Sequence, residues 1–199
     1  MTDPAEVGLR HALSRPAGPS SDFDLNPGIK LAEGRQLRPA AVLMAVWLRP
    51  EGAGVILTKR SSRLKHHPGQ IAFPGGKVDA TDASPMAAAL RETHEEIGLD
   101  PSRVDIIGTL PVHETVTGFA VTPFVGLVRG SFDPLPEAGE VDEVFVVPLK
   151  HVLTKTRFSI QERRWMGELR RYYAVPYGPY YIWGATARIL RGLAERADQ

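Results

Sequence analysis

Three glutamates occupy one short stretch of the sequence at spacings that would bring their carboxylates together on a helix. Glu92, Glu95 and Glu96 stand at positions i, i+3 and i+4, so on a helix they lie on adjacent turns. Three like charges at this spacing repel one another, and a hard divalent cation such as Mg²⁺ or Mn²⁺, which prefers oxygen ligands, would relieve the repulsion. The alternative is an acidic face that only meets water, the usual outcome for such a pattern in isolation.

The residues around the glutamates predict the helix that carries them. Ser84 is a typical N-cap, Pro85 suits the first helical position, and Gly98 suits the position just past the helix end. Four residues recur at helical spacing on another side of this helix: Met86, Leu90, Thr93 and Ile97. We expect that side to face a core, away from the glutamates.

A basic stretch precedes the glycine turn that leads into this helix. It carries four cationic side chains: Lys59, Arg60, Arg63 and Lys65. Cations beside a carboxylate-bound metal suit a polyphosphate, because they can grip its outer oxygens while the metal bridges the inner ones. A solvated loop whose charges only offset the nearby acids explains the same residues about equally well.

Two motifs resemble those of the Nudix superfamily. Residues 91–99 match the second half of the Nudix box, G-x5-E-x7-R-E-U-x-E-E-x-G-U with U apolar, except that Thr93 takes an apolar position. The loop from Gly76 to Arg91 is one residue longer than the pattern, and Asp82 stands near the place of its first glutamate. Residues 57–76 resemble the extended motif of the coenzyme A diphosphatase branch, L-L-T-x-R-S-x-x-L-R-x-H-x-G-Q-x-x-F-P-G-G, and that branch shares the longer loop.

The resemblance implies hydrolysis of the diphosphate bond of coenzyme A to 3′,5′-ADP and 4′-phosphopantetheine, with Mg²⁺ or Mn²⁺ as cofactor. It implies four metal ligands: Glu92, Glu95, Glu96 and the backbone carbonyl of Gly76. Arg91 is expected to pair with Glu95 one turn on and to hold it in position. The extended motif supplies the expected substrate-binding residues: Arg60, Lys65, His67 and Gln70.

The general base stays open between two places. Nudix enzymes take it from the box, where Glu95 is the candidate, or from a later loop, where Glu140 is the candidate and Glu143 a weaker one. A solvated loop carboxylate explains Glu140 at least as well. The adjacent pair His66 and His67 does not predict a metal site, because neighbouring loop residues do not share a face.

Two other functions remain open on the sequence. One is a Nudix hydrolase for another nucleoside diphosphate derivative, such as NADH, ADP-ribose or a dinucleoside polyphosphate. The other is a nucleotide-sensing Nudix-like module without catalysis. A sensing module would be expected to lose acids from the helix, whereas this chain keeps all three.

The composition favours one substantial domain and a small-molecule substrate. The chain has 199 residues, 43% of them hydrophobic, and a net charge of +1 that does not favour nucleic acid or membrane partners. It has no cysteine, which excludes thiolate chemistry. The longest apolar run, residues 40–48, is too short to cross a bilayer. We expect a cytoplasmic protein, and a homodimer is compatible with the sequence.

The order of expected elements predicts an α+β fold. Residues 1–37 are expected to form a helix over 4–14, with an apolar side through Val7, Leu9 and Leu13, and a Pro/Gly-rich arm; residues 38–199 form the Nudix domain. Strands are expected at 41–48, 55–60, 70–73, 104–112, 120–128 and 141–148, a hairpin at 157–164 and 172–175, and a closing helix at 181–196. With the resemblance, this order implies an α/β/α sandwich whose mixed sheet lies between helices.

Overall fold

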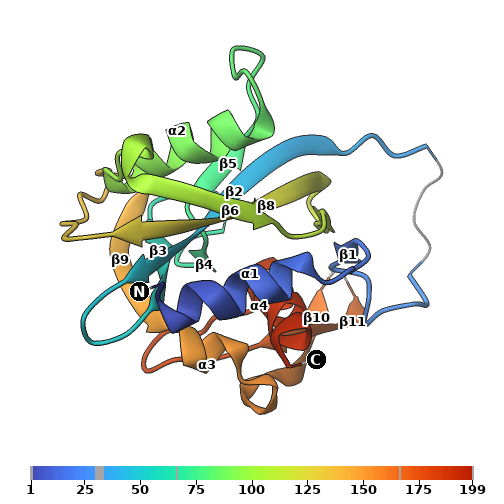
Figure 1. Cartoon of the computed structure of the whole chain (residues 1–199). Helices are drawn as coiled ribbons and strands as arrows, with labels where there is room; N and C mark the ends of the chain where they lie inside the picture. The colour runs from blue at the N-terminus through green and yellow to red at the C-terminus, as the bar shows by residue number, and fades with distance from the viewer. Residues whose placement is uncertain (1, 30–33, 66, 166, 199) are drawn as a thin grey trace.

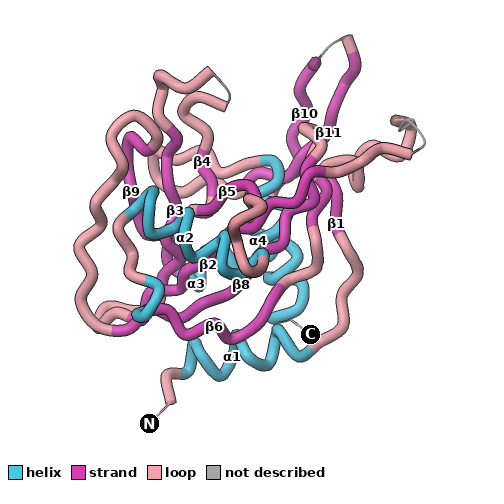
Figure 2. The backbone as a smooth tube through the Cα atoms, turned by 90° about the horizontal axis from the view of Figure 1, so that it is seen from above, coloured by secondary structure: helices cyan, strands magenta, loops and turns pink. Residues whose placement is uncertain are grey.

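The computed structural model describes residues 2–29, 34–65, 67–165 and 167–198 (Figure 1). The helices are α1 (Pro4–Ser14), α2 (Pro85–Ile97), α3 (Leu149–Leu153) and α4 (Gly184–Ala197), with short 3₁₀ turns at Pro101–Arg103 and Lys155–Arg157. The main sheet contains β1 (Ser20–Ser21), β2 (Arg38–Leu48), β3 (Gly54–Arg60), β4 (Ile71–Ala72), β5 (Gly75–Lys77), β6 (Val104–Thr109), β7 (His113–Glu114), β8 (Phe119–Arg129) and β9 (Val141–Pro148). A separate hairpin, which extends away from the main sheet in Figure 2, consists of β10 (Ser159–Trp165) and β11 (Glu168–Ala174).

The sheet is mixed, as predicted. Its two long central strands, β2 and β8, run parallel and pair along their whole length. β3 pairs antiparallel with only one end of β2, at Val46 and Trp47, and then separates from it. β4 pairs with the far part of β3, and β5 pairs with the other end of β2. The chain segment that connects β4 to β5 thereby fills the opening between β2 and β3 and leads directly to α2.

Helices cover both faces of the sheet, which confirms the predicted α/β/α sandwich. α2 lies on one face, and α1, α3 and α4 lie on the other (Figure 1). Neighbouring residues of β2 serve the two sides: Leu43 packs in the α2 layer and Met44 in the α4 layer. β2 is therefore apolar without alternation because it is buried on both faces. Within the described residues, no helix is long and apolar enough to cross a membrane.

Parts of residues 1–37 pack on the body of the protein. In α1, Leu9 is fully buried in the α4 layer, whereas Val7 is exposed, so the predicted apolar side was wrong at Val7. β1 pairs with β7 at one edge of the sheet. Asn26 binds the backbone of β11 through both of its amide atoms, accepting from the Arg171 N–H at 2.8 Å and donating to the Arg171 carbonyl at 2.9 Å. The division of the chain at residue 38 stays a prediction.

α2 begins and ends as predicted, and its buried side includes Thr93 and Ile97 as predicted but not Met86. The Ser84 hydroxyl accepts a hydrogen bond from the Ala87 N–H at 3.1 Å, and Gly98 adopts the left-handed conformation at the helix end. Met86 is 40% exposed, which corrects the predicted core side. The buried residues are Ala88, Ala89, Thr93, Glu96 and Ile97. The small side chains of Ala88 and Ala89 let the helix backbone lie close to the sheet, and Glu96 lies on the same buried side.

Candidate active site

Two glycines bring the main chain against the acidic helix. In β5, Gly75 has φ of 144°, and a Cβ there would lie 2.4 Å from the Ala41 carbonyl oxygen of β2. A Cβ on Gly76 would lie 2.5 to 2.7 Å from the carboxylate atoms of Glu92. A Cβ on Gly75 would clash with the β2 backbone, and a Cβ on Gly76 would displace the Glu92 carboxylate, so the two glycines allow the backbone and this carboxylate to lie close together.

Glu96 is the buried carboxylate of the site. It is 5% exposed, and its Oε2 accepts a hydrogen bond from the Gly75 N–H at 3.2 Å. The Nη1 atom of Arg60, at the end of β3, lies 3.9 Å from Glu96 Oε1. Burial raises the pKa of Glu96 to about 7, with smaller increases from the charges of Glu92 and Glu140, and opposed by Gly75 and Arg60.

Arg91 is held by Asp82, for which the sequence suggested no role. Arg91 Nε donates to Asp82 Oδ1 and Arg91 Nη2 to Asp82 Oδ2, both at 2.9 Å, in the two-point geometry that favours strong arginine–carboxylate pairs. The Asp79 N–H donates to the same carboxylate at 2.8 Å. Hydrogen bonding from Arg91 is the main cause that lowers the pKa of Asp82 to about 2. The signal for this role was the position of Asp82, near the first glutamate of the family pattern.

The other end of the Arg91 guanidinium contacts two glutamates of its own helix. Nη1 donates to Glu92 at 3.0 Å and to Glu95 at 2.9 Å, so the predicted pairing of Arg91 with Glu95 is present. Glu95 is the most exposed of the three acids, with 55% of its side chain accessible. Glu92 lies deeper, and burial raises its pKa despite the hydrogen bond from Arg91.

The donor atoms fit a hard divalent cation, although they do not converge on one point in this arrangement. Carboxylate oxygens of α2 lie beside a backbone turn that only glycine permits, which is suitable oxygen chemistry for Mg²⁺ or Mn²⁺. Across the described ranges, no group of three or more His, Asp or Glu side chains is positioned as a ready metal site. Arginines contact all three carboxylates in this arrangement: Arg91 contacts Glu92 and Glu95, and Arg60 faces Glu96.

The predicted substrate-binding residues belong to a loop whose base lies at the site. The Arg60 N–H donates to the Gln70 carbonyl at 2.9 Å, and the Gly69 N–H donates to the Arg60 carbonyl at 3.0 Å. The backbone thus closes residues 61–69 into a loop. Lys65 and His67 are exposed on it, and Gln70 is half-buried at its end. Of these four described residues, Arg60 is the one with an ion pair to α2. His66 lies outside the described residues.

Glu140 and Glu143, the two candidates for a general base that follow α2 in the sequence, lie in different surroundings. The backbone of Glu140 accepts a hydrogen bond from the Ser61 N–H at 2.8 Å, and the charge of Glu140 acts on the pKa of Glu96. Its loop is therefore joined to the basic loop beside the site. Glu143 instead accepts the Tyr180 hydroxyl hydrogen bond, and the Tyr180 ring stacks on Phe145 with centroids 3.6 Å apart.

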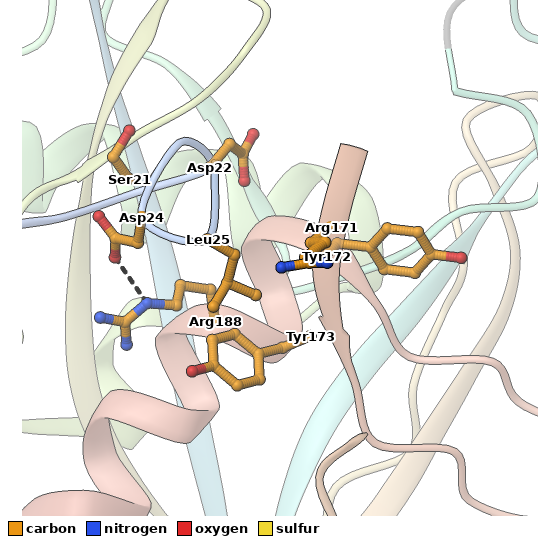
Figure 3. A pocket seen from close by; sticks show the side chains of 9 residues that line it. Ser21, Asp22, Asp24, Leu25, Arg171, Tyr172, Tyr173 and Arg188 are labelled. Atoms are coloured by element: carbon orange, nitrogen blue, oxygen red, sulfur yellow. Dashed lines mark hydrogen bonds and ion pairs between the residues drawn. The ribbon is translucent and has the colours of Figure 1, made fainter. Parts of the chain in front are cut away.

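A small pocket lies elsewhere, between residues 21–25, β11 and the start of α4 (Figure 3). Asp24 and Arg188 form an ion pair in it at 2.8 Å, and Tyr172 points away from this pair. Neither α2 nor the glycine turn contributes to its lining. We place the candidate active site at α2, where the close backbone approach and the acids with raised pKa values coincide.

Comparison with known proteins shows which family this chain resembles. The family model described as the NUDIX domain matches residues 37–169. The uncharacterized Nudix hydrolase NudL of Enterobacter sp. (strain 638) is 46% identical over 157 residues, covering 79% of this chain and 81% of the relative. The protein of the same name from Salmonella newport (strain SL254) is 42% identical over 192 residues, covering 96% of each chain.

Solved structures show the same fold at greater distance. The MutT protein of Methanosarcina mazei Go1 has a TM-score of 0.53 at 21% identity and covers 84% of this chain and 96% of its own. A MutT/nudix family protein of Enterococcus faecalis has a TM-score of 0.51 at 15% identity, with 100% and 75% covered.

The chain belongs to the Nudix family of hydrolases. Its reaction class is hydrolysis of pyrophosphate bonds in nucleoside diphosphate derivatives, and the family generally uses divalent metals such as Mg²⁺ or Mn²⁺.

Proposed function

We propose that this Nudix hydrolase cleaves the diphosphate bond of coenzyme A to 3′,5′-ADP and 4′-phosphopantetheine. The observation that carries the proposal is the course of residues 57–76. This segment, which resembles the extended motif of coenzyme A diphosphatases, runs from β3 through the closed basic loop into the Gly75–Gly76 turn against α2. It therefore offers cations to a bound diphosphate at one end and the acidic helix at the other.

The residues divide the chemical work between them. Glu92, Glu95, Glu96 and the Gly76 carbonyl would hold Mg²⁺ or Mn²⁺, which when bound supplies Lewis-acid polarisation of the diphosphate. Arg91, fixed by Asp82, orients the glutamates. Arg60, Lys65, His67 and Gln70 bind the phosphates and hold the substrate for in-line attack by water.

The proton of the attacking water passes to a carboxylate, for which Glu95 and Glu140 are the proposed candidates. Glu95 is exposed on α2 and Glu140 lies on the loop beside Glu96. Both are placed to exchange protons with solvent afterwards. The variants Glu95→Gln and Glu140→Gln are compared by the pH profile of kcat at saturating Mn²⁺, and the variant that loses the acidic limb of the profile identifies the base.

A substrate comparison tests the proposal. Purified protein with Mn²⁺ is offered coenzyme A, dephospho-coenzyme A, NADH and ADP-ribose, and the products are identified by mass. We expect coenzyme A to give the highest kcat/KM, with 3′,5′-ADP among the products. A preference for NADH or ADP-ribose contradicts the proposed substrate, and binding without turnover of any substrate favours a sensing module. The cytoplasmic location and the homodimer stay predictions from the sequence.

A further inference from the structure

Arg60 lies at the end of β3 on the side that faces α2: Ile56, four residues earlier, packs in the α2 layer, and side chains alternate along a strand. The pairing of β3 with β9 is regular up to Lys59, which lies opposite Glu143, and then shifts so that Arg60 lies opposite Val141. The extra residue of this bulge is Asp142, so β9 rather than β3 is the bulged strand. The Arg60 side chain reaches α2, with its Nη1 atom 3.9 Å from Glu96 Oε1.

Glu96 depends on that cation in the arrangement seen here. A buried carboxylate needs hydrogen bonds or an opposite charge. Among the described residues, the Glu96 carboxylate accepts one hydrogen bond, from the Gly75 N–H at 3.2 Å, and the negative charges of Glu92 and Glu140 oppose its ionisation. The Arg60 guanidinium supplies the opposite charge, the part that a divalent cation would otherwise play.

The contact between Arg60 and Glu96 is loose. Its length of 3.9 Å exceeds that of a charge-assisted hydrogen bond, and the Arg60 side chain is partly open to solvent. Arg91 differs, because the Asp82 carboxylate fixes it at two points and it also binds Glu92 and Glu95. One arginine of the site is therefore fixed and the other is free to change partners.

We infer that Arg60 is an exchangeable counter-ion, which pairs with Glu96 in the metal-free protein and moves to a substrate phosphate when a divalent cation takes Glu96. The inference rests on the proposed function for its substrate. It means that Arg60 opposes metal binding and supports substrate binding, so that the two events are coupled through one side chain. A guanidinium suits both partners, since carboxylate and phosphate oxygens accept the same N–H groups.

The test compares Arg60→Gln with Arg63→Gln, a matched control from the exposed part of the same loop. Mn²⁺ affinity is measured by titration calorimetry without substrate, and the site is defined as the binding lost in Glu96→Gln. We expect Arg60→Gln to bind Mn²⁺ about 3- to 10-fold more tightly than the wild type, as a partly exposed ion pair would require, and to raise the KM for coenzyme A about 10-fold. Arg63→Gln should leave the Mn²⁺ affinity unchanged.

Opposite changes in the two affinities are the signature, because a merely structural role of Arg60 would weaken both. Unchanged or weaker Mn²⁺ binding in Arg60→Gln overturns the inference, as does Mn²⁺ binding that Glu96→Gln does not affect. If coenzyme A is hydrolysed but the Mn²⁺ affinity of Arg60→Gln is unchanged, the exchange fails while the proposed function stands. If Arg60→Gln tightens Mn²⁺ binding but coenzyme A is not hydrolysed, the substrate fails while the exchange with metal stands.

Discussion

Replacing Glu96 by glutamine should stabilise the metal-free protein at about pH 8 while it removes turnover. Burial moves the pKa of Glu96 from its usual 4.5 to about 7. The unfolded chain thus releases the proton at lower pH than the folded protein, and stability falls as the pH rises from 4.5 to about 7. Above that range the ionised folded state carries a penalty of ~3 kcal/mol, which glutamine does not have.

Glutamine can take the place of Glu96 with little change in the surrounding contacts. Glutamine has nearly the same shape, and its side-chain oxygen can still accept the hydrogen bond that the Gly75 N–H now makes to Glu96. The lost attraction to Arg60 is already contained in the shifted pKa, because that residue is among its causes. Any stabilisation should therefore be largest at high pH and absent at about pH 4, where Glu96 is protonated in both states.

The assay is urea unfolding with a chelator at about pH 5 and pH 8, with Glu95→Gln as control. Glu95 is exposed, so its replacement should change the free energy of unfolding by less than about 0.5 kcal/mol. In a parallel assay with Mn²⁺ and coenzyme A, Glu96→Gln should show no turnover. Equal stability of Glu96→Gln and the wild type at about pH 8, or a larger gain at pH 5, would refute the reasoning.

Three further changes test other parts of the structure. Asp82→Asn should lower kcat about 10-fold because Arg91 loses its two-point partner, and Asp82→Glu should restore part of it in steady-state assays. Gly76→Ala should abolish Mn²⁺ binding in calorimetry, since its Cβ would meet the Glu92 carboxylate at about 2.5 Å. Asn26→Ala should lower the free energy of unfolding by ~1 to 3 kcal/mol, because two backbone groups of Arg171 lose their partner; an unchanged urea midpoint would contradict this.

The elements predicted best are those whose signals are local. Ser84, Pro85 and Gly98 define the ends of α2 through interactions within a few residues, and the structure has them as predicted. The continuous apolar run of β2 indicated burial on both faces, and both helix layers are present. The strand expected over 104–112 ends at Thr109, and a separate short strand, β7, follows it at His113–Glu114. The two pair with different parts of β8, and the spacing within one segment does not show where a partner strand allows pairing.

The sequence predicted which residues form the candidate site but not how deeply each of them is buried. Helical spacing placed Glu96 beside Glu92 and Glu95, yet the orientation of α2 on the sheet depends on how closely Ala88 and Ala89 let it approach. The core side predicted from helical spacing included Met86, which is exposed, and it left out Glu96, which is buried. Asp82 was missed for another reason: its partner lies nine residues on, and only the folded loop brings the two together.

The two arginines contact the carboxylates of α2 in two different ways. Asp82 fixes the Arg91 guanidinium, which also contacts Glu92 and Glu95. Arg60 comes from β3 instead of α2, and it lies at a longer distance from its partner, the buried Glu96. A divalent cation would thus find two carboxylates already oriented and one whose counter-ion must leave. Burial raises the pKa of Glu96, so a cation that took the place of Arg60 there would also favour the ionised form of this carboxylate.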